Sequence, residues 1–211
     1  MSLSDDELRL KIQTIPVCVI ISGKRKCGKD HTVRILSDEL RKRSFSHVVI
    51  HLSYPIKRQY AKLHGLDFSE LSSSGPYKEI YRKDMVRWSE QKKTNDLHVF
   101  AREAVQIFLD PVHYTTDVVI LADARRPYDL NYFIDLWDRS RCIIARVIAS
   151  EATRKKRGWI FTTGVDDAET ECALDGFPDW DLIIHNDSDV ESCHTDLLRI
   201  IQKIEDLRRR S

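Results

Sequence analysis

The chain has 211 residues, of which 34 are basic and 33 acidic, and its net charge at neutral pH is +1. This length suits one domain with a sizeable core, and the balanced charge excludes a general attraction to nucleic acids or anionic membranes. The five cysteines are scattered without close pairs, which argues for reduced thiols and against a disulfide framework or a zinc site. The first residues are too charged for a secretory signal, and no apolar run is long enough to span a membrane, so we expect a cytosolic protein.

Five short apolar runs indicate strands that are buried on both faces of a sheet. They cover residues 16–22, 47–52, 117–122, 142–149 and 181–185. Helical stretches separate them, and this alternation predicts a three-layer α/β sandwich with a five-stranded, mainly parallel sheet. One helix is expected from residue 29 to about 43, and an amphipathic helix that begins with a Ser188–Glu191 capping box closes the chain.

A glycine-rich loop reads GKRKCGKD and connects the first predicted strand with the first predicted helix. Its glycines, Gly23 and Gly28, allow backbone N–H groups to turn toward phosphate oxygens, and Lys29 can reach the β- and γ-phosphates of a nucleotide. The loop carries three further cations, Lys24, Arg25 and Lys26. A solvated basic turn is the alternative, but a position between a buried strand and a helix favours a nucleotide-binding loop.

Asp30 occupies the position where such loops usually carry serine or threonine. Magnesium prefers hard oxygen ligands, and a carboxylate supplies one together with a full negative charge. We therefore expect Asp30 to hold the magnesium that accompanies a nucleotide. A second carboxylate, Asp123, ends the third predicted strand beside the loop, where it is either a metal-site residue or a simple cap of a turn or helix.

Two further groups of cations could bind anionic ligands. Arg125 and Arg126 follow Asp123 directly and are expected to face the same crevice, where guanidinium groups bind phosphate or carboxylate. A helix predicted over residues 77–93 has an apolar face for packing and four cations on its flanks, Lys78, Arg82, Lys83 and Arg87. The cations of this helix are either ligand-binding residues or members of ordinary surface pairs.

Two stretches do not fit a plain sandwich. Residues 66–110 form a mainly helical insertion rich in bases and aromatics, and residues 158–180 form an irregular segment. Just before the irregular segment, Arg154 and Arg157 share a helical face, where they either neutralise charge on a transferred phosphoryl group or belong to a solvated charged run. In a small phosphotransferase the two stretches would be the acceptor-binding arm and a mobile lid.

Together these motifs resemble the animal-type phosphomevalonate kinase family. The similar pieces are the loop SGKRKCGKD, the helix YKE..RKDM.RW.E.K, the strand end D.RR and the lid stretch RGW.FT.GVDDAE.EC.LD.F. The resemblance implies a P-loop kinase with a nucleoside-monophosphate-kinase-like fold and one domain over residues 1–211, with an arm at about 54–110 and a lid at about 150–180. It also implies magnesium-dependent transfer of the ATP γ-phosphate to mevalonate 5-phosphate by a cytosolic enzyme of isoprenoid and sterol synthesis, which we expect to be a monomer.

The same resemblance implies roles for individual residues. The ATP site would use the loop from Gly23 to Asp30, in which Cys27 replaces a small residue, together with Asn186 after the last strand. The acceptor would be bound by cations of the arm and of the third strand end, Lys78, Arg82, Lys83, Arg87, Arg125 and Arg126. Arg146, Arg154 and Arg157 would close over both substrates. Four of the cations would be catalytic, namely Lys26, Lys29, Arg154 and Arg157. Compared with the family, the first dozen residues look like an extension.

The main alternative is a nucleotide or nucleoside monophosphate kinase of the same fold. It would need a pocket in which a base can stack, and the arm offers little sign of one. A nucleic-acid-binding ATPase would need a basic stripe with exposed aromatics, whereas here the aromatics fall on apolar faces. An inactive ATP-binding regulator is disfavoured by the presence of Lys29.

Overall fold

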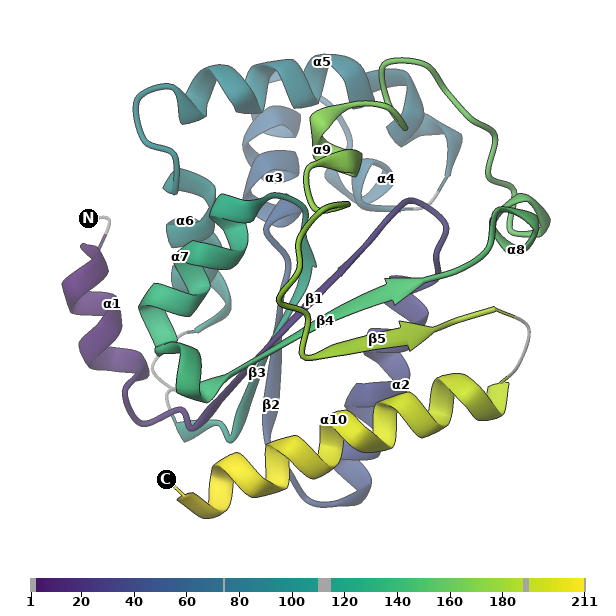
Figure 1. The fold of residues 1–211 in the computed structure, drawn as a ribbon. Coiled ribbons are helices and arrows are strands. Elements are labelled where there is room, and N and C mark those ends of the chain that lie inside the picture. Colours follow the sequence, from purple (N-terminus) through teal and green to yellow (C-terminus); the bar gives the residue numbers. More distant parts are fainter. Residues whose placement is uncertain (1–2, 74, 110–114, 188–189, 211) are drawn as a thin grey trace.

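A computed structural model describes residues 3–73, 75–109, 115–187 and 190–210, the side chains of residues 190–192 excepted. Figure 1 shows a twisted five-stranded sheet with helices on both faces. The strands are β1 (Val17–Gly23), β2 (His47–Ile50), β3 (Val118–Ala124), β4 (Cys142–Ile148) and β5 (Leu182–His185). Their order is β2-β3-β1-β4-β5, and every pairing is parallel. The predicted three-layer sandwich and its five strands are confirmed, with strand ends that differ by one or two residues.

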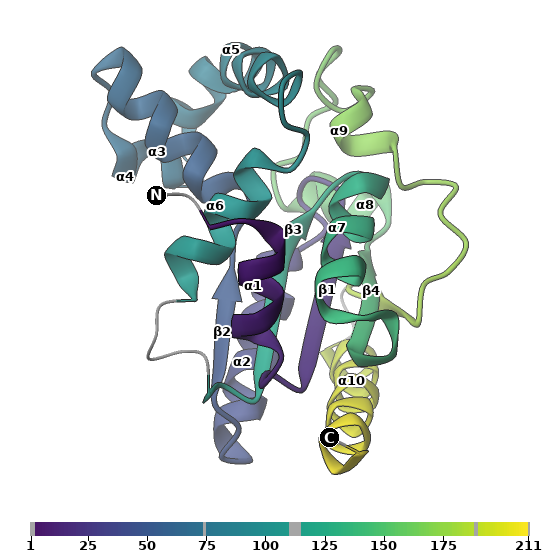
Figure 2. The same cartoon turned by 90° about the vertical axis from the view of Figure 1, so that its left-hand side faces the viewer.

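Helices cover both faces of the sheet (Figures 1 and 2). One face is covered by α2 (Lys29–Lys42) and α10 (Val190–Arg210), and the other by α1 (Asp5–Ile12), α6 (Val99–Phe108) and α7 (Pro127–Trp137). Odd-numbered residues of β1 pack with α2 and α10, and its even-numbered residues pack with α1, α6 and α7. Burial on both faces explains why the predicted strands lack an alternating pattern. Ser188 of the predicted capping box lies outside the described residues.

Helix α1 belongs to the core, although the first dozen residues looked like an extension in the sequence. Ser4 and Glu7 form a capping box at its start, and Leu8 and Ile12 are buried beneath it. Asp5 accepts hydrogen bonds from Arg102 of α6 and Tyr132 of α7. The amino-terminal segment therefore fastens two helices of this layer together.

The predicted arm rises above the carboxyl ends of the strands (Figure 1, top). It contains α3 (Ser53–His64), α4 (Phe68–Ser72) and α5 (Pro76–Lys93), and it has a small hydrophobic cluster of its own around Tyr60, Leu71 and Met85. The predicted range of 54–110 was too long, because α6 packs in the main core against the sheet. Tyr77, Tyr81 and Trp88 pack against that cluster. This confirms that the aromatics of the helix predicted at 77–93 serve packing.

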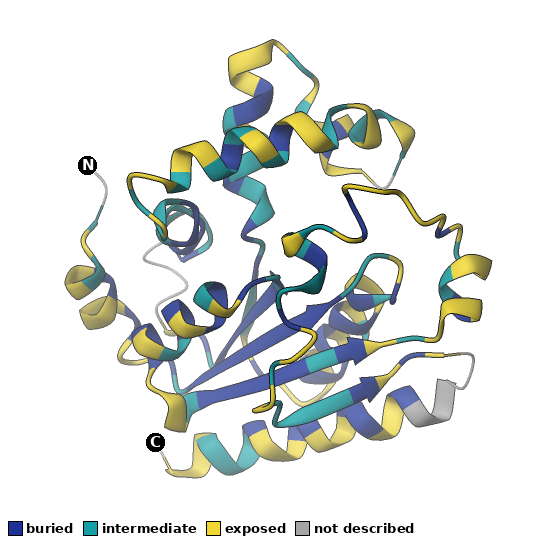
Figure 3. Ribbon diagram, turned by 45° about the horizontal axis from the view of Figure 1, so that its top comes forward, coloured by how far each residue is buried: buried dark blue, intermediate teal, exposed yellow. Residues whose placement is uncertain are grey.

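The predicted lid follows β4. It contains the short helices α8 (Glu151–Lys156) and α9 (Glu169–Cys172), and Figure 3 shows it as a largely exposed run with isolated buried positions. A short 3₁₀ helix, η2 (Arg139–Arg141), precedes β4. Within the described residues, no helix has the length and apolarity that a membrane crossing requires.

Candidate functional site

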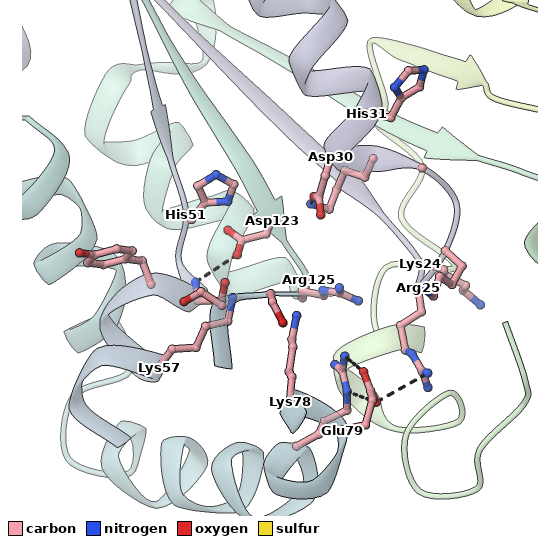
Figure 4. A pocket seen from close by; sticks show the side chains of 18 of the residues that line it. Lys24, Arg25, Asp30, His31, His51, Lys57, Lys78, Glu79, Asp123 and Arg125 are labelled. Atoms are coloured by element: carbon pink, nitrogen blue, oxygen red, sulfur yellow. Dashed lines mark hydrogen bonds and ion pairs between the residues drawn. The ribbon is translucent and has the colours of Figure 1, made fainter. Parts of the chain in front are cut away.

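The carboxyl ends of parallel strands meet at one edge of a sheet, and here they border a cavity of about 590 Å³ beneath the arm. The glycine-rich loop after β1 supplies one wall, and the start of α3 and the helix α5 supply the opposite wall. Residues of all four predicted groups line it together, namely Lys24, Arg25, Lys26, Gly28, Lys29, Asp30, Lys78, Arg82, Asp123, Arg125 and Arg157. Figure 4 shows the arm lysines directed toward Asp30 and Asp123 across this space.

Both glycines of the loop are required by close contacts. A Cβ atom at Gly23 would lie 2.6 Å from the Sγ atom of Cys27 and 2.8 Å from the carbonyl oxygen of Val147. Gly28 has a φ of +88°, and a Cβ atom there would lie 2.1 Å from the Nδ2 atom of Asn186. The loop is thus pressed against the ends of β4 and β5, which gives its backbone one defined course.

Lys29 lies at the centre of the site, between the loop and the end of β3. Its Nζ atom is 2.7 Å from Oδ1 of Asp30 and donates a hydrogen bond to the carbonyl of Ala122. The Lys29 side chain is 8% exposed, while the Asp30 side chain is 85% exposed. Loss of water around the carboxylate would by itself raise the pKa of Asp30, but the charge and hydrogen bond of Lys29 hold that pKa below its ordinary value. Asp30 is therefore ionised and accessible, as a magnesium ligand must be.

Asp123 performs a capping role at the start of α3. Its Oδ1 atom accepts the backbone N–H of Leu52 at 2.6 Å, and its Oδ2 atom accepts that of Ser53 at 3.1 Å. Burial alone would raise the pKa of Asp123, but Lys29, His51 and the two N–H donors hold it below its ordinary value. The carboxylate is ionised, faces the cavity and still has free lone pairs, so capping and a place near a metal are compatible.

Residues on α3 and α5 face the loop across the cavity. Lys57, one turn into α3, stands beside Lys78 of α5, and both residues are half-buried. Burial lowers the pKa of Lys57 against the opposite effect of Asp123 and Asp30. Burial, and then the neighbouring charges of Lys57 and Arg82, lowers the pKa of Lys78 to about 8. Crowded, desolvated cations of this kind are typical of a binding site for a multiply charged anion.

A second cavity of about 170 Å³ adjoins the first and shares a wall of cations with it. The shared residues are Ser53, Lys57, Lys78, Arg82, Asp123 and Arg125. Apolar side chains, among them Ile56, Met85 and Phe100, line its interior. A small molecule with an anionic end and an apolar middle would fit a cavity that has cations along one wall and apolar side chains inside.

Arg126 lines the second cavity but not the first, and it is 5% exposed. One of its terminal nitrogens is 2.9 Å from Glu90, which also pairs with Lys93 at 3.1 Å. Its Nε atom is buried and has no hydrogen-bond partner among the described residues. A buried guanidinium with an unpaired N–H is costly unless a ligand completes its hydrogen bonds.

Carboxylates of the lid hold several of the predicted cations. Asp166 pairs with Arg25 at 2.9 Å, and Glu171 pairs with Arg125. Asp175 pairs with both Lys24 and Arg146, each at 2.6 Å. These lid acids offset locally the positive charge of the loop and of the cations beside it.

The two lid arginines contact the backbone of the loop. Arg154 donates to the carbonyl of Arg25 at 2.8 Å, and its guanidinium carbon lies 4.0 Å from the centre of the Trp159 ring. Arg157 donates to the carbonyl of Cys27 at 2.9 Å and to that of Asn186 at 2.9 Å. Both arginines thus brace the loop, and Arg157 also lines the first cavity.

Some predicted site residues line neither cavity. They are Gly23, Cys27, Lys83, Arg87, Arg146, Arg154 and Asn186. Asn186 is buried, and its side-chain amide donates to the carbonyl of Cys27 at 2.9 Å. Arg87 is 75% exposed and lies 3.8 Å from Asp84, which is the surface pair that the sequence left open. These residues therefore form or support the loop, contact the lid as Arg146 does through Asp175, or lie on the surface of the arm.

Sequence reasoning missed several residues that line the cavities, above all Lys57, Lys93 and Glu171. The signal for Lys57 was available, because it follows the carboxyl end of β2, where ligands of parallel sheets bind. Lys93 falls at the end of α5, where no spacing distinguished it from the neighbouring Lys92. No local pattern distinguished Glu171 from the other acids of the lid.

Comparisons with known proteins identify the family. The model of the family described as phosphomevalonate kinase matches residues 21–139. A curated phosphomevalonate kinase of Drosophila melanogaster is 38% identical over 181 residues, which cover 85% of this chain and 93% of that protein. This chain belongs to the phosphomevalonate kinase family. The matched residues include the loop, the whole arm and the third strand end, so most of the residues that line the two cavities lie within the matched region.

A solved structure supports the fold of this chain. Chaetomium thermophilum Kti12, in complex with ADP-AlF3, resembles it with a TM-score of 0.50 at 12% identity, over 89% of this chain and 98% of that one. At this identity the likeness bears on the fold alone. The fold is of the P-loop kinase type, as the sequence predicted.

Proposed function

We propose that this chain transfers the γ-phosphate of ATP to the phosphate of mevalonate 5-phosphate, giving mevalonate 5-diphosphate and ADP. Membership of the phosphomevalonate kinase family supports the reaction. The observation that carries the proposal is the pair of adjoining cavities that share a wall of cations. Two anionic phosphates can be brought together only where positive charge offsets their repulsion, and this wall supplies that charge.

The larger cavity would hold the triphosphate of ATP. Backbone N–H groups of the loop and the positive end of α2 would bind the β-phosphate, and Lys29 would contact the γ-phosphate. Magnesium, bound beside Asp30 with Asp123 behind it, would screen the charge on the β- and γ-phosphates. The described residues contain no group of three or more His, Cys, Asp or Glu side chains suited to a metal, so phosphate oxygens would complete its ligands.

The smaller cavity would hold the acceptor with its phosphate against the shared wall of Lys57, Lys78, Arg82 and Arg125. The methyl-bearing carbon chain would then contact Met85 and neighbouring apolar side chains. The carboxylate would reach Arg126, whose buried Nε atom has an N–H to donate. This orientation places opposite ends of one small molecule on the two groups of cations of the cavity.

In the reaction, an oxygen of the acceptor phosphate attacks the γ-phosphorus, and the bond from that phosphorus to the β,γ-bridging oxygen breaks as ADP leaves. The attacking oxygen is already ionised near neutral pH, since the second pKa of a phosphate monoester is about 6, so no general base is needed. Lys29, Arg125 and the arm lysines would hold the two phosphates in line and stabilise charge on the transferred group. The lid would exclude water from this group.

The test is a coupled ADP-release assay with purified protein, ATP and Mg²⁺. The acceptors are mevalonate 5-phosphate, mevalonate and a set of nucleoside monophosphates. We expect turnover with mevalonate 5-phosphate to exceed that with each other acceptor by about 10²-fold or more, because only this acceptor meets both groups of cations. Equal or better turnover of a nucleoside monophosphate would make the chain a nucleotide kinase instead.

The depressed pKa of Lys78 predicts that binding of the acceptor depends on pH. Lys78 is protonated below pH 8 and loses its charge as pH rises through its pKa of about 8. We therefore expect the KM for mevalonate 5-phosphate to rise by up to about tenfold between pH 7 and pH 9, since a neutral amine binds phosphate weakly. Arginine keeps its charge over this range, so Lys78→Arg should abolish the rise. A KM that rises equally in Lys78→Arg would assign the pH dependence to another group, such as Lys57.

Variants of Asp30 test whether its carboxylate serves the metal. Asp30→Asn keeps the shape and removes the charge, so we expect about tenfold lower activity at low magnesium and partial recovery as free Mg²⁺ is raised. Asp30→Ser supplies the hydroxyl that such loops usually carry and should retain more activity than Asp30→Ala. The measurement is initial rate against free Mg²⁺ for all three variants. If Asp30→Ala matches the parent at every concentration, Asp30 has no part in holding the metal.

A further inference from the structure

A buried carboxylate of the lid lies outside both cavities and yet contacts two of the proposed site cations. Asp166 is 8% exposed in a lid whose neighbouring residues are mostly exposed. Its Oδ2 atom accepts hydrogen bonds from Nη1 of Arg25 and from the backbone N–H of Thr162, each at 2.9 Å. Its Oδ1 atom accepts the indole N–H of Trp159 at 2.8 Å. Such a fully paired buried carboxylate holds a fixed geometry, because breaking any one contact is costly.

The same carboxylate lies 3.8 Å from Arg154, whose guanidinium packs on the ring of Trp159. The Arg25 guanidinium also approaches the arm, where its Nη2 atom lies 3.8 Å from Glu79. Two nitrogens of Arg82 donate hydrogen bonds to the same Glu79 carboxylate, at 2.8 Å and 2.7 Å. Figure 4 shows the contacts of Glu79 with Arg25 and with the neighbouring arginine as dashed lines. Alternating charges thus join the lid, the phosphate-binding loop and the arm.

We propose that Asp166 is a positioning residue that holds the Arg25 guanidinium in place for phosphoryl transfer. The proposal rests on the proposed function, in which Arg25 lines the ATP cavity from the loop. Arg25 has a long side chain with several rotamers, and Glu79 is too exposed to fix it alone. Asp166 is buried, so its ion pair with Arg25 is little screened by solvent and holds one rotamer. Because Asp166 belongs to the lid, Arg25 takes this position only when the lid lies against the loop.

The neighbouring residue provides a matched control. Asp167 is chemically identical and adjacent in sequence, but it is exposed and its side chain accepts a hydrogen bond from the backbone of Gly164 within the lid. We expect Asp166→Asn to lower kcat by about 10- to 100-fold, with both KM values within about threefold of the parent, because the charge that fixes Arg25 in the transition state is lost. Asp167→Asn should stay within about twofold in kcat. Asp166→Glu, which keeps the charge, should recover part of the loss.

A double-mutant cycle separates positioning from a general structural role. If Asp166 acts through Arg25, then Asp166→Asn should lower kcat by no more than about threefold further in an Arg25→Met background. Losses that multiply, or an Asp166→Asn variant as active as Asp167→Asn, would overturn the proposal. If the parent turns over a different acceptor, the proposed function fails, and the same cycle with that acceptor still decides the role of Asp166.

Limited chymotrypsin digestion of the ligand-free protein checks the contact without any turnover. Phe161 in the lid is 55% exposed and offers a cleavage site. We expect Asp166→Asn and Arg25→Met to speed cleavage of the lid to a similar extent, the double variant to be no faster, and Asp167→Asn to match the parent. Faster cleavage in Asp166→Asn alone would show that Asp166 holds the lid without Arg25, which contradicts the proposal.

Discussion

Lys29→Met is expected to lower kcat by about 10³-fold or more. Its ammonium is buried at the centre of the site, between Asp30 and the end of β3, where no other cation of the loop can replace it. In the proposed reaction it follows the γ-phosphate during transfer, so its loss removes a charge that acts mainly in the transition state. Methionine has a similar length and keeps the packing of the stem.

The magnesium dependence distinguishes this variant from those at Asp30. Added Mg²⁺ should not restore Lys29→Met, because the metal cannot occupy the path of the missing ammonium, whereas Asp30→Asn should recover in part. The measurement is single-turnover formation of ADP over a range of free Mg²⁺, which separates the chemical step from product release. A Lys29→Met variant that recovers at high magnesium would mean that Lys29 only screens the bound nucleotide.

Arg126→Met should raise the KM for mevalonate 5-phosphate by about 10²- to 10³-fold. The expectation follows from its burial and from the unpaired Nε atom that the acceptor carboxylate would satisfy. Removing one partner of a buried, hydrogen-bonded charge pair costs about 2–5 kcal/mol of binding. Arg126→Lys keeps the charge but loses the planar fork, so it should fall between the parent and Arg126→Met.

An acceptor without a carboxylate tests which end of the substrate Arg126 meets. The parent should use a five-carbon alkyl phosphate poorly, because this compound has no carboxylate for Arg126 to bind. For the same reason, Arg126→Met should change kcat/KM for the alkyl phosphate little. Arg87→Met is the matched control, since Arg87 is an exposed arginine that lines neither cavity. If Arg126→Met lowers kcat/KM equally for both acceptors, then Arg126 binds the phosphate and the acceptor lies in the opposite orientation.

Local pattern was enough to predict the sheet and the phosphate-binding loop. A strand buried on both faces must be apolar throughout, and β1 is apolar for this reason. The two glycines also predicted the tight course of the loop correctly. The backbone passes so close to Cys27 and Asn186 that a side chain at either glycine would clash. The resemblance to phosphomevalonate kinases, confirmed by the relatives, rested on these same local motifs.

Helix α1 shows where pattern reading failed although a signal existed. Its first turn is acidic and its capping box is regular, but it is short and strongly charged, so it looked like an appended tail. Only Leu8 and Ile12 turn inward, and two residues give too weak a periodicity to indicate burial. The core on which they pack is built by α6 and α7, far along the chain.

The tertiary structure alone decided which charges meet. The sequence placed Arg25 in a basic loop and Asp166 in an acidic stretch, and only the return of the lid over the loop brings them within 2.9 Å across 141 residues. In the same way, the chain path, and not the motif, gives Arg126 an unpaired N–H beside an apolar cavity and leaves Arg87 in solvent. Periodicity and spacing predict which face of its own helix or strand a residue occupies. Which ion pairs form across a site depends on how the crossovers of the parallel sheet place distant elements side by side, and no local pattern encodes that placement.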